Sequence, residues 1–219
     1  VAGVSLGQVP SIETSGTRID CDLIVLASGV NAAAVKMTGS RYIPPVTQVM
    51  SQDELFLGNN EVASRLGNVA HAFVQPRSGL IFGSLVPKGA FINVSVLSRS
   101  DLHVSVDDFL KYDMVRRILP QHYEHACGCR PKVAVSPAHN FIADRFVAVG
   151  DAAVSRLYKD GIGSSLLTAR QAAFTVIHHG ISRAALEQHY QPLCQKISRD
   201  NWWGQQLFSI NRYAKNSRL

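Results

Sequence analysis

The chain has 219 residues, of which 46% are hydrophobic and 17% charged, with a net charge of +6. This composition predicts a globular protein with a sizeable core and excludes a disordered chain. The basic residues are scattered along the chain, so we expect no nucleic-acid partner despite the positive charge.

Other sequence-wide features narrow the class of protein further. No apolar run reaches 18 residues, so no transmembrane helix is predicted. The first residues lack the basic and apolar regions of a signal peptide, and the four cysteines are too few for a disulfide framework. We therefore expect a cytoplasmic protein.

Residues 1–40 are predicted to hold two or three strands followed by a short helix or loop. The continuous apolar run Leu23–Ala27 indicates a strand covered on both faces, which ends at Gly29. Residues 41–135 change to alternating apolar segments separated by Gly and Pro, which predicts an antiparallel sheet. Within them, a helix is expected from an N-cap at Ser105 to Pro120.

Residues 136–180 return to a buried strand, "RFVAVG", a loop, and a helix rich in small residues. We expect Ser164 or Ser165 to cap that helix. Its apolar spacing predicts a buried side that comprises Leu166, Leu167, Ala169, Ala173, Phe174 and Ile177. Further helices are expected in residues 181–219.

The stretch "GDAAVSRLYKDGIGSS" has the residue types of a ligand site. Asp151 follows a strand end, where ligands bind in open α/β sheets, and a carboxylate there accepts hydrogen bonds from hydroxyl pairs. Gly161 and Gly163 allow close backbone approach, and the helix N-terminus attracts negative charge. The alternative is a glycine-rich connection that binds nothing.

Three segments resemble one family. "VAVGDAA…DGIGSSLLTARQAA" resembles the second FAD-binding motif of the flavoprotein monooxygenase and geranylgeranyl-reductase-like superfamily. "RIDCDLIVLASGVNA" is similar to the upstream segment of that superfamily that ends in Ala-Asp-Gly. "IFGSLVPKGAFINVSV" resembles a strand pair of geranylgeranyl reductases. The three segments occur in the family's order.

The resemblance implies a mixed α/β fold: a partial Rossmann-like FAD-binding domain, interrupted by an antiparallel substrate domain and followed by C-terminal helices. It implies that Asp151 holds the ribityl hydroxyls of FAD, that Gly150 before it belongs to the same cofactor site, and that Gly29 lies near the pyrophosphate. The other implied positions are Gly161, Ile162 and Gly163 at the flavin ring, and Pro87, Lys88 and Gly89 on the substrate side.

The sequence departs from the family's pattern in three places and lacks one element. Ser28 replaces an Asp, Gly83-Ser84-Leu85-Val86 replaces an aromatic motif, and "SRLYKD" replaces a Pro-containing loop. The G-x-G-x-x-G turn that binds the ADP half of FAD does not occur. We therefore expect a C-terminal portion of a longer flavoprotein that alone binds FAD weakly or not at all.

Two clusters have competing interpretations. His122, His125, Cys127 and Cys129 are metal-competent, but their spacing is not that of a zinc site, so we expect no metal and a loop with a buried cysteine. A redox role for the two thiols is the alternative. Trp202 and Trp203 beside basic residues leave contact with a membrane surface open, although packing against the domain is the commoner role.

The sequence thus favours an FAD-dependent oxidoreductase acting on a small apolar substrate, with no catalytic acid or base fixed by spacing. Within that class a reductase, favoured by the "PKG…NVSV" segment, and a monooxygenase both remain open. The alternative of another class is a non-catalytic interaction module that keeps the fold without the cofactor. The expected partners are the missing N-terminal part of the polypeptide and, through the exposed sheet edge, a second copy of the chain.

Overall fold

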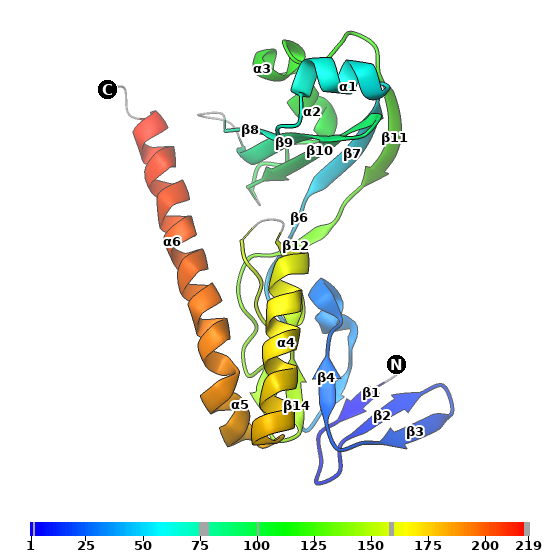
Figure 1. Ribbon diagram of the computed structural model, residues 1–219, viewed down its shortest axis with the longest axis vertical. Coiled ribbons are helices and arrows are strands. Elements are labelled where there is room, and N and C mark those ends of the chain that lie inside the picture. The colour runs from blue at the N-terminus through cyan, green and yellow to red at the C-terminus, as the bar shows by residue number, and fades with distance from the viewer. Residues whose placement is uncertain (2, 75–78, 100, 158–159, 217–219) are drawn as a thin grey trace. The chain divides into compact units, whose positions relative to one another are not determined.

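The computed structural model describes residues 1, 3–74, 79–99, 101–157 and 160–216. The chain has a mixed α/β fold in two compact units, which are coloured from blue to red along the sequence in Figure 1. The first unit comprises residues 1–47 and 133–210, and the second comprises residues 48–132 and the last part of the chain from residue 211. Strands β6 (Thr47–Val49) and β12 (Lys132–Ala134) pair where the chain passes from one unit to the other.

The first unit holds two small sheets and the long helices. Its strands are β1 (Gly3–Ser5), β2 (Ser11–Thr14), β3 (Thr17–Asp20), β4 (Ile24–Leu26), β5 (Met37–Thr38), β13 (Ile142–Ala143) and β14 (Phe146–Ala148). Its helices are the 3₁₀ helices η1 (Gly29–Ala34) and η2 (Gly150–Ala152), then α4 (Gly161–His179), α5 (Arg183–His189) and α6 (Gln191–Asn216), which belongs to this unit up to Ile210.

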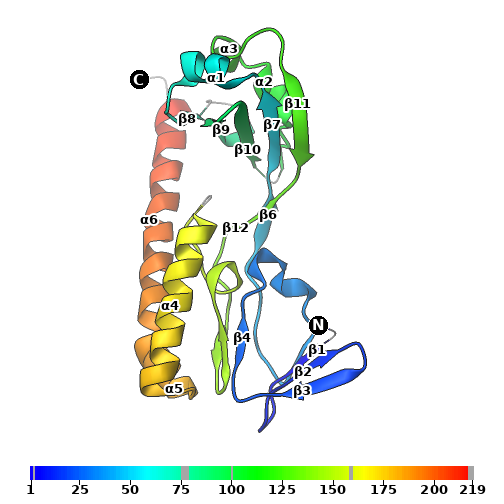
Figure 2. The same ribbon diagram turned by 45° about the vertical axis from the view of Figure 1, so that its right-hand side comes forward.

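Strands β14 and β4 form the parallel pair on which the first unit is built. Phe146, Val147 and Ala148 pair in register with Ile24, Val25 and Leu26, in a three-stranded sheet of order β13-β14-β4. Strand β14 is fully buried, as its continuous apolar run predicts. Helix α4 and the first part of α6 run side by side in both views (Figures 1 and 2).

The apolar run Leu23–Ala27 was predicted to be a strand covered on both faces, and this prediction is wrong for β4. Its residues alternate, with Val25 51% exposed between buried Ile24 and Leu26. The physical reason is that Ile24 and Leu26 face the core that holds Val4 and Phe146, while Val25 points to the opposite face, which the described residues leave half open.

The second unit is a five-stranded antiparallel sheet in the order β11-β7-β10-β9-β8. Its strands are β7 (Ser51–Phe56), β8 (His71–Phe73), β9 (Leu80–Lys88), β10 (Phe91–Ser98) and β11 (Glu124–Cys129), and its helices are α1 (Asn59–Leu66), α2 (Val106–Leu110) and α3 (Asp113–Arg116). Phe109 packs directly over Gly83, where a Cβ would overlap the phenyl ring.

The single helix expected from Ser105 to Pro120 is two short helices instead. The cap is as predicted, because Ser105 accepts from the Asp108 backbone N–H and Asp108 reaches back in a capping box. Helix α2 then ends at Lys111, and Tyr112 has an extended backbone with φ −64° and ψ 133°. Burial of Phe109 and Leu110 fixes α2, while Met114 on α3 is 58% exposed.

Candidate cofactor-binding site

The carboxyl ends of β14 and β4 bring two predicted site segments together. Val149 N–H donates to the Leu26 carbonyl at 3.0 Å, so Gly29 after β4 and Gly150-Asp151 after β14 leave the sheet side by side. The 3₁₀ helices η1 and η2 that begin at these glycines contact each other. This edge is where ligands bind in open α/β sheets.

Gly150 forms the turn at the end of β14. Its φ of +59° is a left-handed conformation, and a Cβ there would lie 2.5 Å from Ser165 Oγ. Gly150 N–H donates to Thr168 Oγ1 at 2.8 Å, and that hydroxyl donates to the Ser164 carbonyl at 2.8 Å. These hydrogen bonds therefore hold the Gly150 turn against the first turns of α4, and a residue larger than glycine does not fit at this position.

Asp151 follows directly and points to the start of α4. A Cβ on Gly161 would lie 3.3 Å from Asp151 Oδ2 and 3.6 Å from Oδ1, so the absence of a side chain leaves room for the carboxylate. Asp151 Oδ1 is buried and has no hydrogen-bond partner among the described residues. A buried carboxylate oxygen is costly to leave unpaired, so this atom indicates a ligand that supplies a donor.

Ser28 Oγ is a second buried side-chain oxygen without a partner in the described part of the chain. Ser28 precedes Gly29 at the end of β4, on the strand paired with β14. Two unpaired oxygens at adjacent strand ends, together with the free N–H groups of the α4 N-terminus, fit a ligand with several hydroxyls and an electron-rich edge. The ribityl chain and the pyrimidine side of a flavin have these features.

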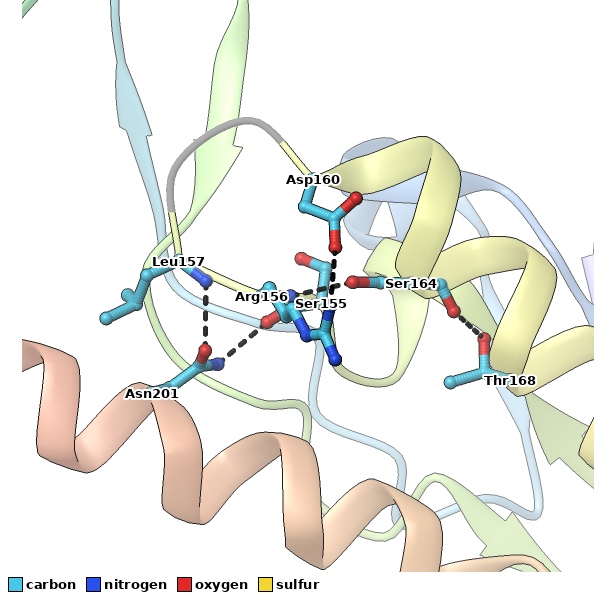
Figure 3. Close-up of polar contacts among 7 residues, drawn as sticks. All are labelled: Ser155, Arg156, Leu157, Asp160, Ser164, Thr168 and Asn201. Atoms are coloured by element: carbon cyan, nitrogen blue, oxygen red, sulfur yellow. Dashed lines mark hydrogen bonds and ion pairs between the residues drawn. The ribbon is translucent and has the colours of Figure 1, made fainter.

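The loop before α4 is held by α6 (Figure 3). Leu157 N–H donates to Asn201 Oδ1 at 2.9 Å, and Asn201 Nδ2 donates to the Ser155 carbonyl at 2.7 Å. Arg156 N–H donates to Ser164 Oγ at 2.9 Å, and the Arg156 guanidinium lies 3.4 Å from Asp160 Oδ2. The "SRLYKD" segment thus has a fixed start and end, while Tyr158 and Lys159 lie outside the described residues.

The predicted cap of α4 is wrong. The helix begins at Gly161 after Asp160, and no side chain caps it. Ser164 lies one turn inside the helix, where its hydroxyl holds the preceding loop through Arg156 N–H. The first backbone N–H groups of α4 are therefore not satisfied by a cap, which suits a ligand.

Tyr42 supports the site and was not predicted. Its hydroxyl donates to the Ala152 carbonyl at 2.6 Å, and its ring meets Phe146 edge-on at 5.9 Å between centroids. Burial raises the pKa of Tyr42 to about 12, so the phenol remains a donor at neutral pH. Since 110 positions separate Tyr42 from Ala152, no local sequence pattern could have revealed this contact.

The predicted residues thus fall into two groups. Gly150, Asp151, Gly161 and Gly29 meet at one edge, and Gly163 adjoins them, where a Cβ would overlap the Asp160 carboxylate. Ile162 lies on α4 but its side chain is 91% exposed.

The predicted substrate-side residues belong to the second unit. Pro87 and Lys88 end β9, and Gly89 has a φ of +61° in the turn to β10. The Lys88 ammonium pairs with Glu54 Oε1 at 2.5 Å.

Helix α4 reverses the burial that its apolar spacing predicts. Its inner face is small and polar, with Ser164, Thr168 and Thr175 at 0% and Ala172 at 4% exposure. The outward side is apolar, and its large exposed residues are Ile162 (91%), Leu166 (69%), Leu167 (40%), Phe174 (50%) and Ile177 (74%). The physical reason is the close approach of the helix to the Gly150 turn, which admits hydroxyls and small side chains only.

Metal-ligand clusters and membrane-spanning helices are both absent from the described residues. No three His, Cys, Asp or Glu side chains converge as metal ligands there. Nor does any described helix have the length and apolar character needed to cross a bilayer.

The chain resembles known proteins in fold but not in sequence. No protein-family model matches the sequence, and a search of curated proteins finds no match. Among solved structures, the chain is similar to CmlS, a flavin-dependent halogenase, with a TM-score of 0.65 and 16% identity over 96% of this chain and 41% of CmlS. The chain has the fold of flavin-dependent enzymes.

Two further solved structures are similar in fold to the chain. The p-nitrophenol 4-monooxygenase PnpA from Pseudomonas putida DLL-E4 has a TM-score of 0.61 and 14% identity over 92% of this chain and 57% of PnpA. The rebeccamycin biosynthetic enzyme RebC, solved with reduced flavin, has a TM-score of 0.60 and 17% identity over 90% of this chain and 41% of RebC. The chain thus spans 41–57% of the length of these three proteins.

Proposed function

We propose that the chain is the flavin-side portion of an FAD-dependent oxidoreductase that acts on an apolar organic substrate. The observation that carries the proposal is Asp151 Oδ1, a buried carboxylate oxygen without a partner among the described residues, at the carboxyl end of a parallel strand. The likeness of the fold to a flavin-dependent halogenase and to an enzyme solved with reduced flavin supports it.

In this proposal the residues of the edge bind and orient the cofactor. The Asp151 carboxylate accepts hydrogen bonds from the ribityl hydroxyls, and Ser28 Oγ at the neighbouring strand end offers a second polar contact. Because Gly161 and Gly163 have no side chains, the Asp151 and Asp160 carboxylates lie against the first turn of α4. The positive end of the α4 dipole favours the negative charge that a reduced flavin carries.

When bound, the flavin supplies the redox chemistry, namely acceptance of a hydride and its delivery to substrate or oxygen. The chain contributes position and electrostatics, and Tyr42 keeps η2 in place through Ala152. We assign no catalytic acid or base.

Of the two enzyme types that the sequence left open, we favour the oxygen-using one. The similar structures are a halogenase, a monooxygenase and a biosynthetic enzyme with reduced flavin, and none of the three is described as a reductase. The likeness to geranylgeranyl reductases rests on the "PKG…NVSV" segment, and Pro87, Lys88 and Gly89 in that segment form the end of one hairpin.

We further propose that the ADP half of FAD is held by an additional strand–helix unit of the same protein. Two uncovered surfaces of the first unit support this: the free edge of β4 with Val25, and the apolar outward side of α4. A parallel strand beside β4 and an amphipathic helix on α4 would cover both. The share of the similar proteins that this chain spans leaves ample length for such a unit.

The test is expression of the whole reading frame, beginning at its first start codon, beside the 219-residue chain. We expect the longer protein to be yellow with about one FAD per chain and this chain alone to be colourless. Oxidation of a reduced pyridine nucleotide should then consume oxygen; turnover under anaerobic conditions with a saturated product would favour the reductase instead. Stoichiometric FAD on this chain alone would refute the additional strand–helix unit, and a colourless longer protein would refute the flavin site itself.

A further inference from the structure

Strand β11 carries a cysteine pair that the flavin proposal does not use. In the described sheet it is the outermost strand and pairs with β7, and its sequence ends in Cys127-Gly128-Cys129. Both thiols are free and exposed. The expectation of a loop with a buried cysteine is therefore wrong, because this segment pairs with the edge of the sheet.

The two thiols lie on the same face of the sheet. Cys127 stands opposite Glu54 and Cys129 opposite Gln52, and these two β7 residues alternate along their strand. Two residues of extended strand span about 6.6 Å between Cα atoms. Native disulfides have Cα separations of roughly 4.4–6.8 Å, so the pair is at the upper end of the range that a disulfide can bridge.

The strand can shorten between the two cysteines. Gly128 has no neighbour within 4 Å of where a Cβ would be, so its backbone is free to pucker. A bulge between His125 and Cys127 already bends the strand on one side of the pair. Closure of an S–S bond therefore requires movement at one unhindered residue of an edge strand.

The surroundings distinguish the two sulfurs. Asp53, 7% exposed, accepts from His125 Nδ1 at 2.6 Å and from Cys127 N–H at 3.2 Å, which anchors the strand beside Cys127. Desolvation, then the adjoining Cys127 thiol and the Asp53 carboxylate, raise the pKa of Cys129. Asp53 thus fixes the backbone at Cys127, and the Cys129 thiol adjoins the Cys127 thiol.

The remaining cysteines lie in the first unit and differ in kind. Cys21 is half-buried, and its thiol donates to the Pro10 carbonyl at 3.5 Å. Cys194 is buried, and desolvation raises its pKa to about 11. Neither has the exposure or the neighbouring thiol that the β11 pair has.

We propose that Cys127 and Cys129 form a reversible dithiol–disulfide site that exchanges with small-molecule disulfides. The Cys127 thiolate attacks one sulfur of the external disulfide and releases one thiolate, which leaves a mixed disulfide on Cys127. Cys129 loses its proton and attacks Cys127 Sγ, which releases the second thiolate and closes the intramolecular bond. In total, two protein thiols are oxidised and one external disulfide is reduced to two thiols.

The experiment treats the native full chain with 5,5′-dithiobis(2-nitrobenzoate), an aromatic disulfide whose thiolate product absorbs visible light. We expect two thiolates released per chain in a fast phase, and an intact mass two hydrogens lower than that of the reduced protein. Peptide mapping should place the new bond between Cys127 and Cys129. Incubation with glutathione disulfide should give the same bond, and dithiothreitol should reverse it.

Two variants serve as matched controls. Cys129→Ser should release one thiolate in the fast phase and retain the aromatic group on Cys127. Gly128→Val should keep the first step but slow the second, because a β-branched residue stiffens the strand. Two retained aromatic groups on the native chain, or a bond that joins two chains instead, would overturn the proposal.

Discussion

Apolar residues are exposed on the outward side of helix α4 and buried in the sheet of the second unit. In the second unit, Leu55, Leu85, Ile92 and Val94 are all at 0% exposure in one core. On α4, residues of the same type are up to 91% exposed, while serine and threonine fill the inner face. The second unit buries these residues in its core, whereas the outward side of α4 leaves its apolar residues exposed.

The difference separates a packed sheet core from a helix side whose apolar residues are exposed. An apolar helix face and a strand edge left bare on one unit are typical surfaces for further packing, whereas the sheet core of the second unit is complete. The inner face of α4 is polar because it serves the Gly150 turn. The close packing of that face on the turn leaves room for small and polar side chains, so the large apolar residues of α4 lie on the other side.

The largest expected effect contrasts the same substitution at the two places. Leu85→Ala, in the second unit's core, should lower the free energy of unfolding by about 2–5 kcal/mol. Leu166→Ala, at 69% exposure on α4, should change it by less than about 0.5 kcal/mol in this chain. Urea unfolding of both variants measures the contrast; equal losses would show that α4's outward side is packed after all.

A second pair of variants tests how tightly the inner face of α4 is packed. Gly29 and Gly150 have nearly the same φ, +61° and +59°, but only Gly150 is crowded, by Ser165. Gly29→Ala should cost about 1–2 kcal/mol of stability for the left-handed backbone alone. Gly150→Ala should cost about 1–3 kcal/mol more for overpacking. Unfolding free energies that agree between the two variants would contradict the close approach.

The hydroxyls of that inner face give a third contrast. Thr168→Val removes the acceptor of Gly150 N–H and should cost about 1–3 kcal/mol, because a buried donor is left unpaired. Thr175→Val, at an equally buried position, removes a hydroxyl that donates within the helix to the Gln171 carbonyl and leaves no donor unpaired. Thermal unfolding should therefore show the larger loss of stability for Thr168→Val. The reverse order would be evidence against the hydrogen bond from Gly150 N–H to Thr168.

The smallest effect concerns alkaline pH. The pKa of Tyr42 is raised to about 12, above the value near 10 of an unfolded tyrosine. Its contribution to stability is complete below about pH 10 and is lost as the pH rises through about 12, because the unfolded chain releases the proton first. Stability should fall less steeply across this range in Tyr42→Phe. An unchanged slope would show that burial does not raise the pKa of the Tyr42 phenol.

Much of the edge that forms the candidate site was predictable from sequence. A continuous apolar run followed by Gly-Asp marks a buried strand and its end, and the parallel partner strand follows from the second apolar run before Gly29. Both signals are local. The antiparallel character of residues between the two strands was equally visible from their alternation.

The features that sequence reasoning missed depend on contacts between distant residues. Tyr42 donates a hydrogen bond to Ala152, and Asn201 donates one to the loop before α4; neither contact has a local sequence pattern that predicts it. Periodicity located α4's apolar stripe but not its direction, because the direction depends on what the helix packs against. The exposure of the β11 cysteines followed from sheet order, which spacing does not reveal.

The most direct test of the flavin site is the dissociation constant of FAD for the complete protein with and without the Asp151 carboxylate. Asp151→Ala should weaken FAD binding by roughly 10- to 100-fold, as expected for the loss of charge-assisted hydrogen bonds worth about 1.5–3 kcal/mol. Asp22→Ala, which removes a carboxylate with 98% of its side chain exposed before β4, should leave FAD affinity unchanged. Equal affinity of the Asp151→Ala variant and the native protein would contradict the account.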